Sequence, residues 1–415
     1  MSRIRWTTWL FLGAGILVAC RPVSSPAVEN TAPPGPGTIQ ISQTPTIKAS
    51  PDPTADSAGT APPSTTPTPE LSPLPACNQA SEVELDELTL AFAANWDGDR
   101  EIYTIRADGS NQTQLTSNTS GDVLPVWSPD GEKLAFIVDR YTEPKLFISD
   151  EDGLMGKIVA PEIDASAPAL NWSPAGDRIS FRNLDDVYVI EIETGEALNI
   201  TQGTNLLPLD LSISTDGSML AFTADALDGT ARNRLFVVNV DGTGLKEISF
   251  PEGDIYRPKW HPFQEKILFE GIVPGEGVVL HVATIDGAIE KLPIVPRYRA
   301  PKPVWSPDGS MIGYIVHLSG FDSSGERMQL NSLRVATAAG EVDLELLRPP
   351  DDPDVGLSLH EIVWAPDSRH LVYSIPSESA DSGVDLIVLD ICDGSSVLIA
   401  EAVDSFSTPS WRPLP

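Results

Sequence analysis

From residue 88 onward, short apolar runs alternate with clusters of glycine, proline, aspartate and asparagine. One stretch shows the pattern well, with PVW at 125–127, KLAFIV at 133–138, KLFISD at 145–150 and KIVA at 157–160. Each run is short and rich in β-branched and aromatic residues, which is typical of strands rather than helices. The pattern predicts an all-β structure built from units of four antiparallel strands.

A turn motif marks the units, because WSPDG at 127–131 returns at 305–309 and in altered form elsewhere. Proline sets the φ angle of the first turn position and glycine accepts a left-handed backbone, so the motif suits a hairpin between the first two strands. Successive anchor positions are separated by 45, 41, 47, 45, 59 and 47 residues. The anchors are Trp127, Trp172, Ile213, Trp260, Trp305, Trp364 and Trp411.

A repeat of this length with four strands per unit is typical of a β-propeller. Seven anchors predict a seven-bladed β-propeller of four-stranded antiparallel blades. The first unit begins at its second strand, at 88–93, and the chain ends at a first strand around Trp411. We therefore expect the N- and C-terminal strands to pair and close the ring, with the tryptophans packed between neighbouring blades.

Residues 1–20 carry Arg3 and Arg5 before an apolar run, which is typical of an export signal. The run ends in Leu17-Val18-Ala19-Cys20, which resembles a bacterial lipobox. This predicts a lipoprotein signal peptide, with Cys20 lipidated after cleavage and the protein held to a membrane by its N-terminal lipid. An ordinary signal peptide that contains a cysteine is the alternative.

Residues 21–76 contain 14 prolines among threonine, serine and alanine and show no apolar periodicity, which predicts a disordered linker. The propeller is expected over residues 77–415. The whole chain has 59 acidic and 27 basic residues, a formal net charge of -32. A surface this acidic disfavours nucleic acid as a partner.

Two stretches carry a family resemblance: PVWSPDGEKLAF at 125–136 and DREIYTIRADGSNQTQLT at 99–116 resemble the repeats of TolB-type propeller proteins. The resemblance covers residues 88–411. It implies an exported propeller that acts as a binding or scaffolding module for a protein or envelope ligand. Related repeats also occur in propeller domains of serine peptidases, and certain seven-bladed propeller lyases have a similar architecture. A propeller enzyme of the lyase or hydrolase type, with a channel active site, is therefore the alternative.

The sequence offers little for catalysis, since it contains no G-x-S-x-G, CxxC, G-x-x-x-x-G-K or H-E-x-x-H motif. Its Asp-Gly pairs fall where strands turn, which favours hairpins over calcium loops. We predict no catalytic residues, no metal and no cofactor. The histidines considered as metal ligands fall at different strand positions without ligand spacing, and they are His261, His281, His317, His360 and His370.

Charged residues occupy the position three before the anchor in four consecutive units: Asp210, Arg257, Lys302 and Glu361. Because the first strand of a blade lines the central channel, we expect them at one mouth of the channel. One hypothesis pairs Asp210 with Arg257 and Lys302 with Glu361. The other is a ligand-binding mouth that selects a charged group, such as a carboxylate. Long connections at 316–332 and 348–360 are expected on the same face, and the neighbouring candidate residues are Tyr256, Tyr298, Arg299 and His360.

Cys77 and Cys392 are the two cysteines that remain beside Cys20. Exported proteins meet oxidising conditions in many bacteria, which favours a disulfide over free thiols. Cys392 ends a third strand, and Cys77 precedes the second strand that rises from the same face of the next blade. Ring closure should bring them together, so we predict a Cys77–Cys392 disulfide. Two separate thiols are the alternative.

Overall fold

The structure is a computed structural model. Contacts divide the chain into Met1–Gly35 and Pro36–Pro415, and every described residue belongs to the second unit. The signal peptide and nearly all of the linker, with Cys20, lie outside the described residues. No helix in the described part is long and apolar enough to span a membrane. The described residues are 74–78, 83–139, 144–153, 156–160, 170–183, 185–227, 229, 232–294, 302–317, 319–321, 323, 325, 327–348, 358–377, 383–405 and 408–414.

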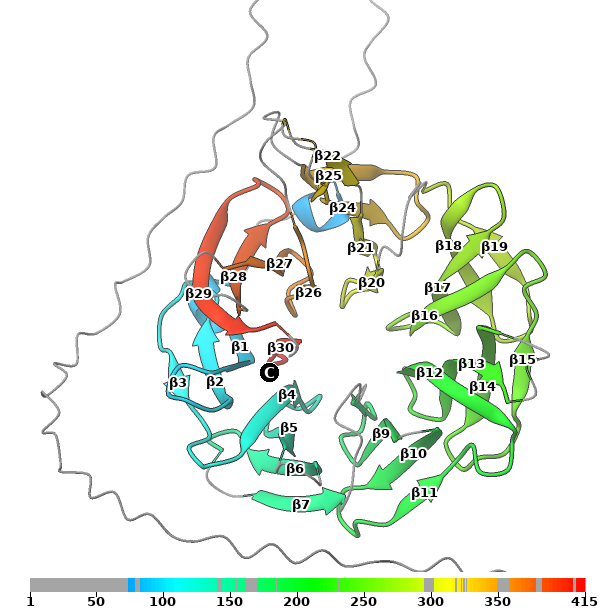
Figure 1. Cartoon of the computed structure of the whole chain (residues 1–415), viewed down its shortest axis with the longest axis horizontal. Coiled ribbons are helices and arrows are strands. Elements are labelled where there is room, and N and C mark those ends of the chain that lie inside the picture. The colour runs from blue at the N-terminus through cyan, green and yellow to red at the C-terminus, as the bar shows by residue number, and fades with distance from the viewer. Residues whose placement is uncertain are drawn as a thin grey trace, which may run out of the picture. The chain divides into compact units, whose positions relative to one another are not determined.

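Five sheets each hold four antiparallel strands and form blades around a common centre (Figure 1). The first contains β4 (Gly121–Trp127), β5 (Lys133–Asp139), β6 (Lys145–Asp150) and β7 (Gly156–Ala160). The second contains β8 (Asn171–Trp172), β9 (Arg178–Asn183), β10 (Asp186–Glu191) and β11 (Ala197–Asn199). The third contains β12 (Leu206–Ile213), β13 (Met219–Ala226), β14 (Arg234–Asn239) and β15 (Lys246–Ile248). The fourth contains β16 (Asp254–Trp260), β17 (Lys266–Val273), β18 (Gly277–Thr284) and β19 (Ile289–Lys291). The fifth contains β20 (Val304–Trp305), β21 (Met311–Val316), β24 (Ser332–Thr337) and β25 (Asp343–Leu347).

The remaining elements include one eight-stranded sheet of order β26-β27-β28-β29-β1-β2-β3, with β30 paired to β1 beside this path. Two 3-10 helices, η1 (Pro75–Asn78) and η2 (Leu85–Glu87), precede β1, and a small hairpin of β22 (Ser319–Phe321) and β23 (Arg327–Gln329) lies within the connection expected at 316–332. The strands of the large sheet are β1 (Thr89–Ala94), β2 (Glu101–Arg106), β3 (Thr113–Gln114), β26 (Ile362–Trp364), β27 (His370–Pro376), β28 (Gly383–Asp390), β29 (Ser396–Asp404) and β30 (Ser410–Trp411).

The prediction of seven separate four-stranded blades is therefore wrong. Five sheets are four-stranded blades, and the strands predicted for two more form the single eight-stranded sheet. The physical reason is the length of β29, which runs for nine residues and brings Val403 opposite Ala94 of β1. The all-β architecture and the antiparallel four-stranded blades agree with the sequence pattern.

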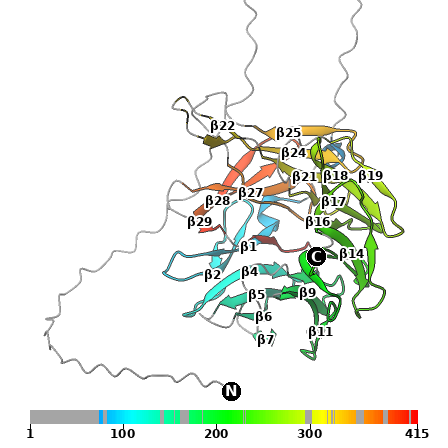
Figure 2. The same cartoon turned by 45° about the vertical axis from the view of Figure 1, so that its right-hand side comes forward.

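The two ends of the described chain meet in the large sheet (Figures 1 and 2). β30 pairs with β1 through Trp411 opposite Leu90 and Ser410 opposite Ala91. The expected pairing of the terminal strands is thus present. Because the last strand completes the half-sheet that the first strand begins, the ring is closed by backbone hydrogen bonds rather than by side-chain packing alone.

The anchor tryptophans link neighbouring sheets at their inner edges. Four of them donate the indole N–H to the backbone carbonyl of the residue just before the preceding anchor, and for Trp411 that residue belongs to the same eight-stranded sheet. In two other junctions that residue is a serine, and its Oγ accepts the backbone N–H of the tryptophan instead, from Ser212 to Trp260 and from Ser410 to Trp127, both at 3.1 Å. The four indole bonds are Trp172 to Val126 (3.0 Å), Trp305 to Lys259 (3.2 Å), Trp364 to Val304 (3.2 Å) and Trp411 to Val363 (3.3 Å).

The turn motif forms the predicted hairpin turn between the first two strands of a blade. In the β20–β21 turn, the Gly309 N–H donates to the Ser306 carbonyl at 2.8 Å, and Ser306 Oγ accepts the Met311 N–H at 3.0 Å. Gly309 has a φ of +70°, and a Cβ there would lie 2.5 Å from the ring of His261. Only glycine fits this position without displacing the ring.

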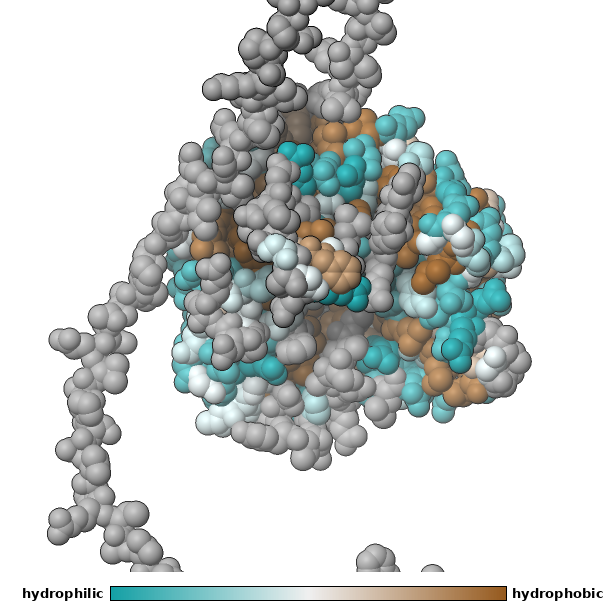
Figure 3. Space-filling model, turned by 45° about the horizontal axis from the view of Figure 1, so that its top comes forward, coloured by the Kyte–Doolittle hydropathy of each residue, from teal (hydrophilic) through white to brown (hydrophobic). Residues whose placement is uncertain are grey.

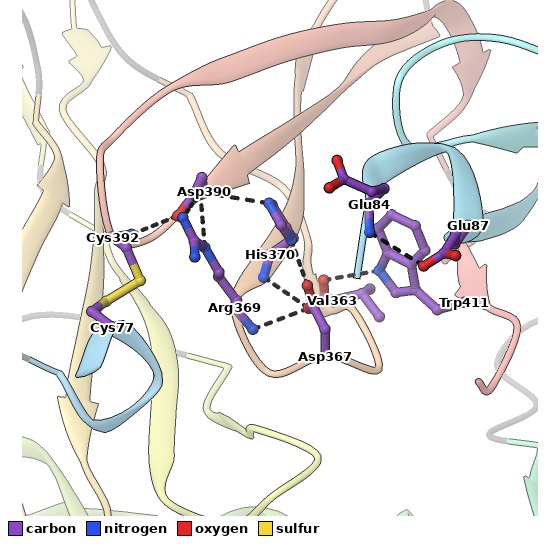
Figure 4. A network of polar contacts seen from close by, with 10 residues as sticks. All are labelled: Cys77, Glu84, Glu87, Val363, Asp367, Arg369, His370, Asp390, Cys392 and Trp411. Atoms are coloured by element: carbon purple, nitrogen blue, oxygen red, sulfur yellow. Dashed lines mark hydrogen bonds and ion pairs between the residues drawn. A yellow bond between two sulfur atoms is a disulfide. The ribbon is translucent and has the colours of Figure 1, made fainter. Parts of the chain in front are cut away.

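A disulfide joins Cys77 in η1 to Cys392 after β28, the pair that the sequence predicted, with their Cα atoms 5.3 Å apart. The Cys392 N–H donates to Asp390 Oδ1 at 2.8 Å, and Asp390 also accepts from Arg369 at 2.7 Å (Figure 4). Leu74, just before η1, is buried in the same apolar cluster as residues of the eight-stranded sheet. The bond therefore ties the start of the described chain to the core near its end.

Replacing both cysteines with serine should lower the free energy of unfolding by at most about 4 to 5 kcal/mol, the chain-entropy figure for a long loop. Urea denaturation of the full chain measures the loss. Reductant should bring the wild-type chain to the stability of the double variant and leave the variant itself unchanged. Alkylation of both Cys77 and Cys392 in the unreduced protein, seen by mass spectrometry, would contradict the bond.

Two carboxyl groups, Glu101 of β2 and Asp122 of β4, are fully buried where these strands meet. Glu101 accepts hydrogen bonds from the Thr116 hydroxyl and from the Asn118 N–H, the latter at 2.7 Å. Asp122 Oδ2 accepts from Asn118 Nδ2 at 2.6 Å, whereas its Oδ1 has no hydrogen-bond partner in the described part of the chain. Burial, reinforced by the charge of Glu101 and opposed by the bonds from Thr116 and Asn118, raises the pKa of Asp122 to about 7.

Asp122→Asn tests this assignment through the pH dependence of stability. The folded pKa lies above the unfolded value near 4, so the wild-type chain should lose free energy of unfolding relative to the variant as the pH rises from about 4 to about 7. Outside that window the difference between the two chains should stay constant. Urea denaturation across a pH series measures it, and a difference that does not vary with pH would contradict the raised pKa.

Candidate ligand-binding channel

The inner strands enclose two adjoining cavities of about 600 Å³ and 690 Å³. Their shared walls make them two parts of one channel, which extends from the first residues of the inner strands to the turn motifs. We call the end at which the inner strands begin the mouth. Most of the lining is proline, aliphatic side chains and tryptophan, and the residues that line both cavities are Leu211, Lys259, Pro307, Val363, Trp364 and Thr408.

Proline shapes the inner strands at the mouth. Pro258 of β16 has no N–H, and the pairing of β16 with β17 shifts register between Tyr256 and Lys259. Arg257, just before this proline, has a left-handed backbone with a φ of +50°. Prolines 125 and 303 follow residues with the same conformation, Leu124 at +58° and Lys302 at +43°. The bulges free backbone N–H groups at the mouth for other acceptors.

Five charged residues connect successive sheets at the mouth, partly through these backbone N–H groups. We call the five residues the mouth ladder: Asp210, Arg257, Glu270, Lys302 and Glu361. Asp210 Oδ2 accepts the Arg257 N–H at 3.0 Å, and the Arg257 guanidinium binds both oxygens of Glu270 at 2.9 and 3.2 Å. Glu270 Oε1 also accepts the Lys302 N–H at 2.8 Å. The Lys302 ammonium then binds Glu361 at 2.6 Å. The ladder ties four sheets together at the mouth.

The observed pairs match one half of the pairing hypothesis. Lys302 binds Glu361 as that hypothesis predicted, but the side chain of Arg257 binds Glu270, and Asp210 reaches only its backbone. The other candidates lie nearby. The hydroxyl of Tyr256 accepts from Asn233 at 2.6 Å, and the carbonyl of His360 accepts from the Lys302 ammonium at 3.1 Å. Tyr298 and Arg299 lie outside the described residues.

Glu270 was not among the predicted site residues, although it is the most buried member of the ladder at 1% exposure. Burial raises its pKa to about 7, opposed by the charge of Arg257 and by the Lys302 N–H. The sequence did contain a signal, because Glu270 is the single acid in the apolar run KILFEGIV of β17. A charge in the middle of a buried strand requires a partner.

Lys259 was also missed, and it lies deeper in the channel than the ladder. It directly precedes the anchor Trp260 and lines both cavities. Its ammonium makes no hydrogen bond or ion pair with the described residues. Burial lowers its pKa, opposed by the charges of Asp210 and Glu361. The sequence did contain a signal for it. Alignment of the repeats shows a lysine one position before the anchor Trp260, whereas the charged residues that were compared lie three positions before each anchor.

Apolar side chains are exposed around the mouth. Four of the nine large hydrophobic residues that are exposed in the described part lie at the ends of second strands or in the start of an inner strand, and Phe321 lies in the β22–β23 hairpin that follows the second strand β21. In Figure 3 hydrophobic side chains lie among hydrophilic ones rather than in one continuous patch. The five residues at the mouth are Trp96, Leu209, Leu227, Ile272 and Phe321.

The described residues contain no group of three or more histidine, cysteine, aspartate or glutamate side chains arranged to hold a metal ion. Three of the histidines weighed as ligands have structural neighbours instead. His261 packs edge-on against Trp305 with ring centroids 4.7 Å apart, and His370 bonds Asp367 at 2.6 Å. His281 stacks on Phe269 at 5.3 Å.

Residues 65–264 match the family model of the TolB beta propeller domain. The Tol-Pal system protein TolB of Desulfosudis oleivorans is 32% identical over 108 residues, which cover 25% of this chain and 24% of that protein. A TolB homolog of Chlorobium luteolum is 39% identical over 61 residues, covering 15% and 14%. The chain thus matches no more than about a quarter of either relative's length.

Among solved structures, an oligogalacturonate lyase in complex with manganese superimposes with a TM-score of 0.55. The alignment covers 76% of this chain and 84% of the lyase, at 14% sequence identity. At this identity the likeness concerns the fold alone.

Arg257→Ala should lower the free energy of unfolding by about 2 to 3 kcal/mol at pH 8, because Glu270 is then left buried without its cation. The loss should shrink below pH 7, where Glu270 takes up a proton. Lys302→Ala is the matched control and should cost about 1 kcal/mol or less, since Lys302 and Glu361 are 37% and 34% exposed. Urea denaturation measures both. Adding Glu270→Gln should recover most of the Arg257→Ala loss, and equal losses in the two single variants would contradict the assignment.

Proposed function

Because this chain carries TolB-type propeller repeats, we propose that it is an extracytoplasmic lipoprotein whose propeller binds a protein or another envelope ligand at the mouth of the channel. The observation that carries the proposal is the combination at the mouth of exposed apolar side chains with a cavity about 600 Å³ in volume. Apolar and aromatic anchors around a concave centre are typical of protein-binding surfaces. The propeller would act as a scaffold rather than as a catalyst.

The sequence before the propeller supports an anchored module. The lipobox-like Leu17-Val18-Ala19-Cys20 would place lipid on Cys20, and the proline-rich segment 21–76 would act as a tether spanning on the order of 40 Å. Such a tether would hold the propeller clear of the membrane while keeping it near envelope partners. The Tol-Pal name of the Desulfosudis oleivorans relative also favours an envelope partner.

A propeller enzyme of the lyase or hydrolase type is the second candidate, and the fold likeness to oligogalacturonate lyase favours it. The contacts at the mouth favour binding over catalysis. Four of the five ladder residues are held in ion pairs with one another, and Asp210 accepts a backbone N–H. Groups held in this way stabilise the junctions between sheets, whereas a general acid or base must be within reach of a substrate proton.

Phe321→Ala, on the mouth side, should weaken capture of the envelope partner, and Phe263→Ala should not. Both phenylalanines are 72% exposed, but Phe263 lies in the turn between β16 and β17, on the opposite face. Removing an exposed aromatic anchor from an interface typically weakens binding about tenfold or more. Crosslinking of the full chain in intact envelopes, followed by mass spectrometry, measures capture. Equal capture by wild type and Phe321→Ala, or equal loss in both variants, would contradict a binding surface at the mouth.

A further inference from the structure

One ring of residues lies below the mouth ladder, and all of its members except Ser212 line one or both cavities. It consists of the residues that directly precede the seven anchors. Six members are uncharged and small or aliphatic, and only one carries charge. The members are Val126, Asn171, Ser212, Lys259, Val304, Val363 and Ser410. Lys259 therefore brings the single charge of these seven positions into the channel.

The structure shows why Lys259 is available to a ligand. Its backbone carbonyl, not its side chain, makes the structural contact, since it accepts the indole N–H of Trp305 at 3.2 Å. The cations above it are engaged, Arg257 with Glu270 and Lys302 with Glu361. Lys259 is half-buried, lines both cavities and has no such partner among the described residues, so its ammonium is available to a charged group that enters the channel.

We propose that Lys259 binds a carboxylate of the ligand that enters the channel, and that this carboxylate belongs to an acidic side chain of a protein segment. The carboxylate would provide the counter-ion that Lys259 lacks. An ion pair formed inside the channel is stronger than one at the surface because fewer water molecules screen it. The inference rests on the proposed binding function and names the chemistry that the mouth would select.

The walls favour a peptide over an acidic sugar. Around Lys259 the walls are mostly proline, tryptophan and aliphatic side chains, and the charged residues Arg257, Lys302 and Glu361 of the same cavity are already engaged in ion pairs. A uronate oligosaccharide has many hydroxyl groups and would leave most of them unpaired against such walls. A segment with one acidic residue between apolar ones matches both the walls and the single ammonium.

Two capped pentapeptides test the proposal directly: N-acetyl-Ala-Leu-Glu-Leu-Ala-amide and the same peptide with glutamine at the centre. The full chain, with its lysines reductively methylated with carbon-13, reports binding by NMR, and Lys259→Arg assigns the Lys259 signal. The glutamate peptide should shift that signal and bind about tenfold or more tightly than the glutamine peptide. Lys259→Met should bind both peptides equally. Lys266→Met is the control. It removes an exposed lysine at the start of β17, the end of that strand that lies away from the mouth, and it should keep the preference for the glutamate peptide.

Several outcomes would overturn the proposal: no shift of the Lys259 signal with the glutamate peptide, equal affinity for the two peptides, or a preference that survives in Lys259→Met. Tighter binding of trigalacturonate than of the glutamate peptide would assign the site to an acidic sugar instead. The titration does not depend on the natural partner. Failed capture in envelopes with an intact glutamate preference would count against the proposed function alone, and successful capture without the preference would count against the Lys259 site alone.

Discussion

The hydrogen bond between each anchor tryptophan and the inner strand of the preceding repeat is the contact on which the rest of the structure depends. It holds neighbouring sheets together at their inner edges, and so it determines which side chains face the channel. Where the acceptor is a backbone carbonyl, as at Lys259, the side chain of that residue is free to vary. Where the acceptor is the hydroxyl of Ser212 or Ser410, the side chain is committed to the junction. The channel can therefore carry chemistry at some positions of the ring without weakening its closure.

At the mouth, proline residues likewise leave backbone groups to make the contacts between sheets. By interrupting the strand ladder they direct the N–H groups of Arg257 and Lys302 to acidic side chains of the neighbouring sheet. The ion pairs that follow are placed where burial is incomplete for the cations, while Glu270 is almost fully enclosed. Such a ladder adds little stability in total, since desolvation offsets most of the attraction, but removal of one member leaves another unpaired. Its main consequence is a fixed relative position of four sheets around the mouth.

The sequence predicted the local features of this fold because they are local in origin. Strands, the serine-proline-aspartate-glycine turns and the incomplete units at the two ends all follow from short-range patterns, and the Cys77–Cys392 bond follows from the geometry of closure. The number of separate sheets did not follow, because it depends on how far β29 extends toward β1. The partner of Arg257 was missed for a related reason. An alignment of repeats compares equivalent positions, whereas Glu270 lies on a second strand, outside the set of positions that were compared.

The charged groups of the channel are distributed unevenly, and this asymmetry has a consequence for any ligand. The mouth ladder and Lys259 all come from the arc between β12 and β26, and all of them except the buried Glu270 line the smaller cavity. The other cavity is lined mainly by neutral residues such as Leu124, Val126 and Trp411, and Lys259 stands at the boundary between the two. A ligand with one charged and one apolar end would therefore enter in a single orientation, because reversing it would bring the apolar end against the ion pairs and leave its charge unpaired on the neutral side. Selectivity in this propeller would then depend on the order of polar and apolar groups along the ligand as much as on their identity.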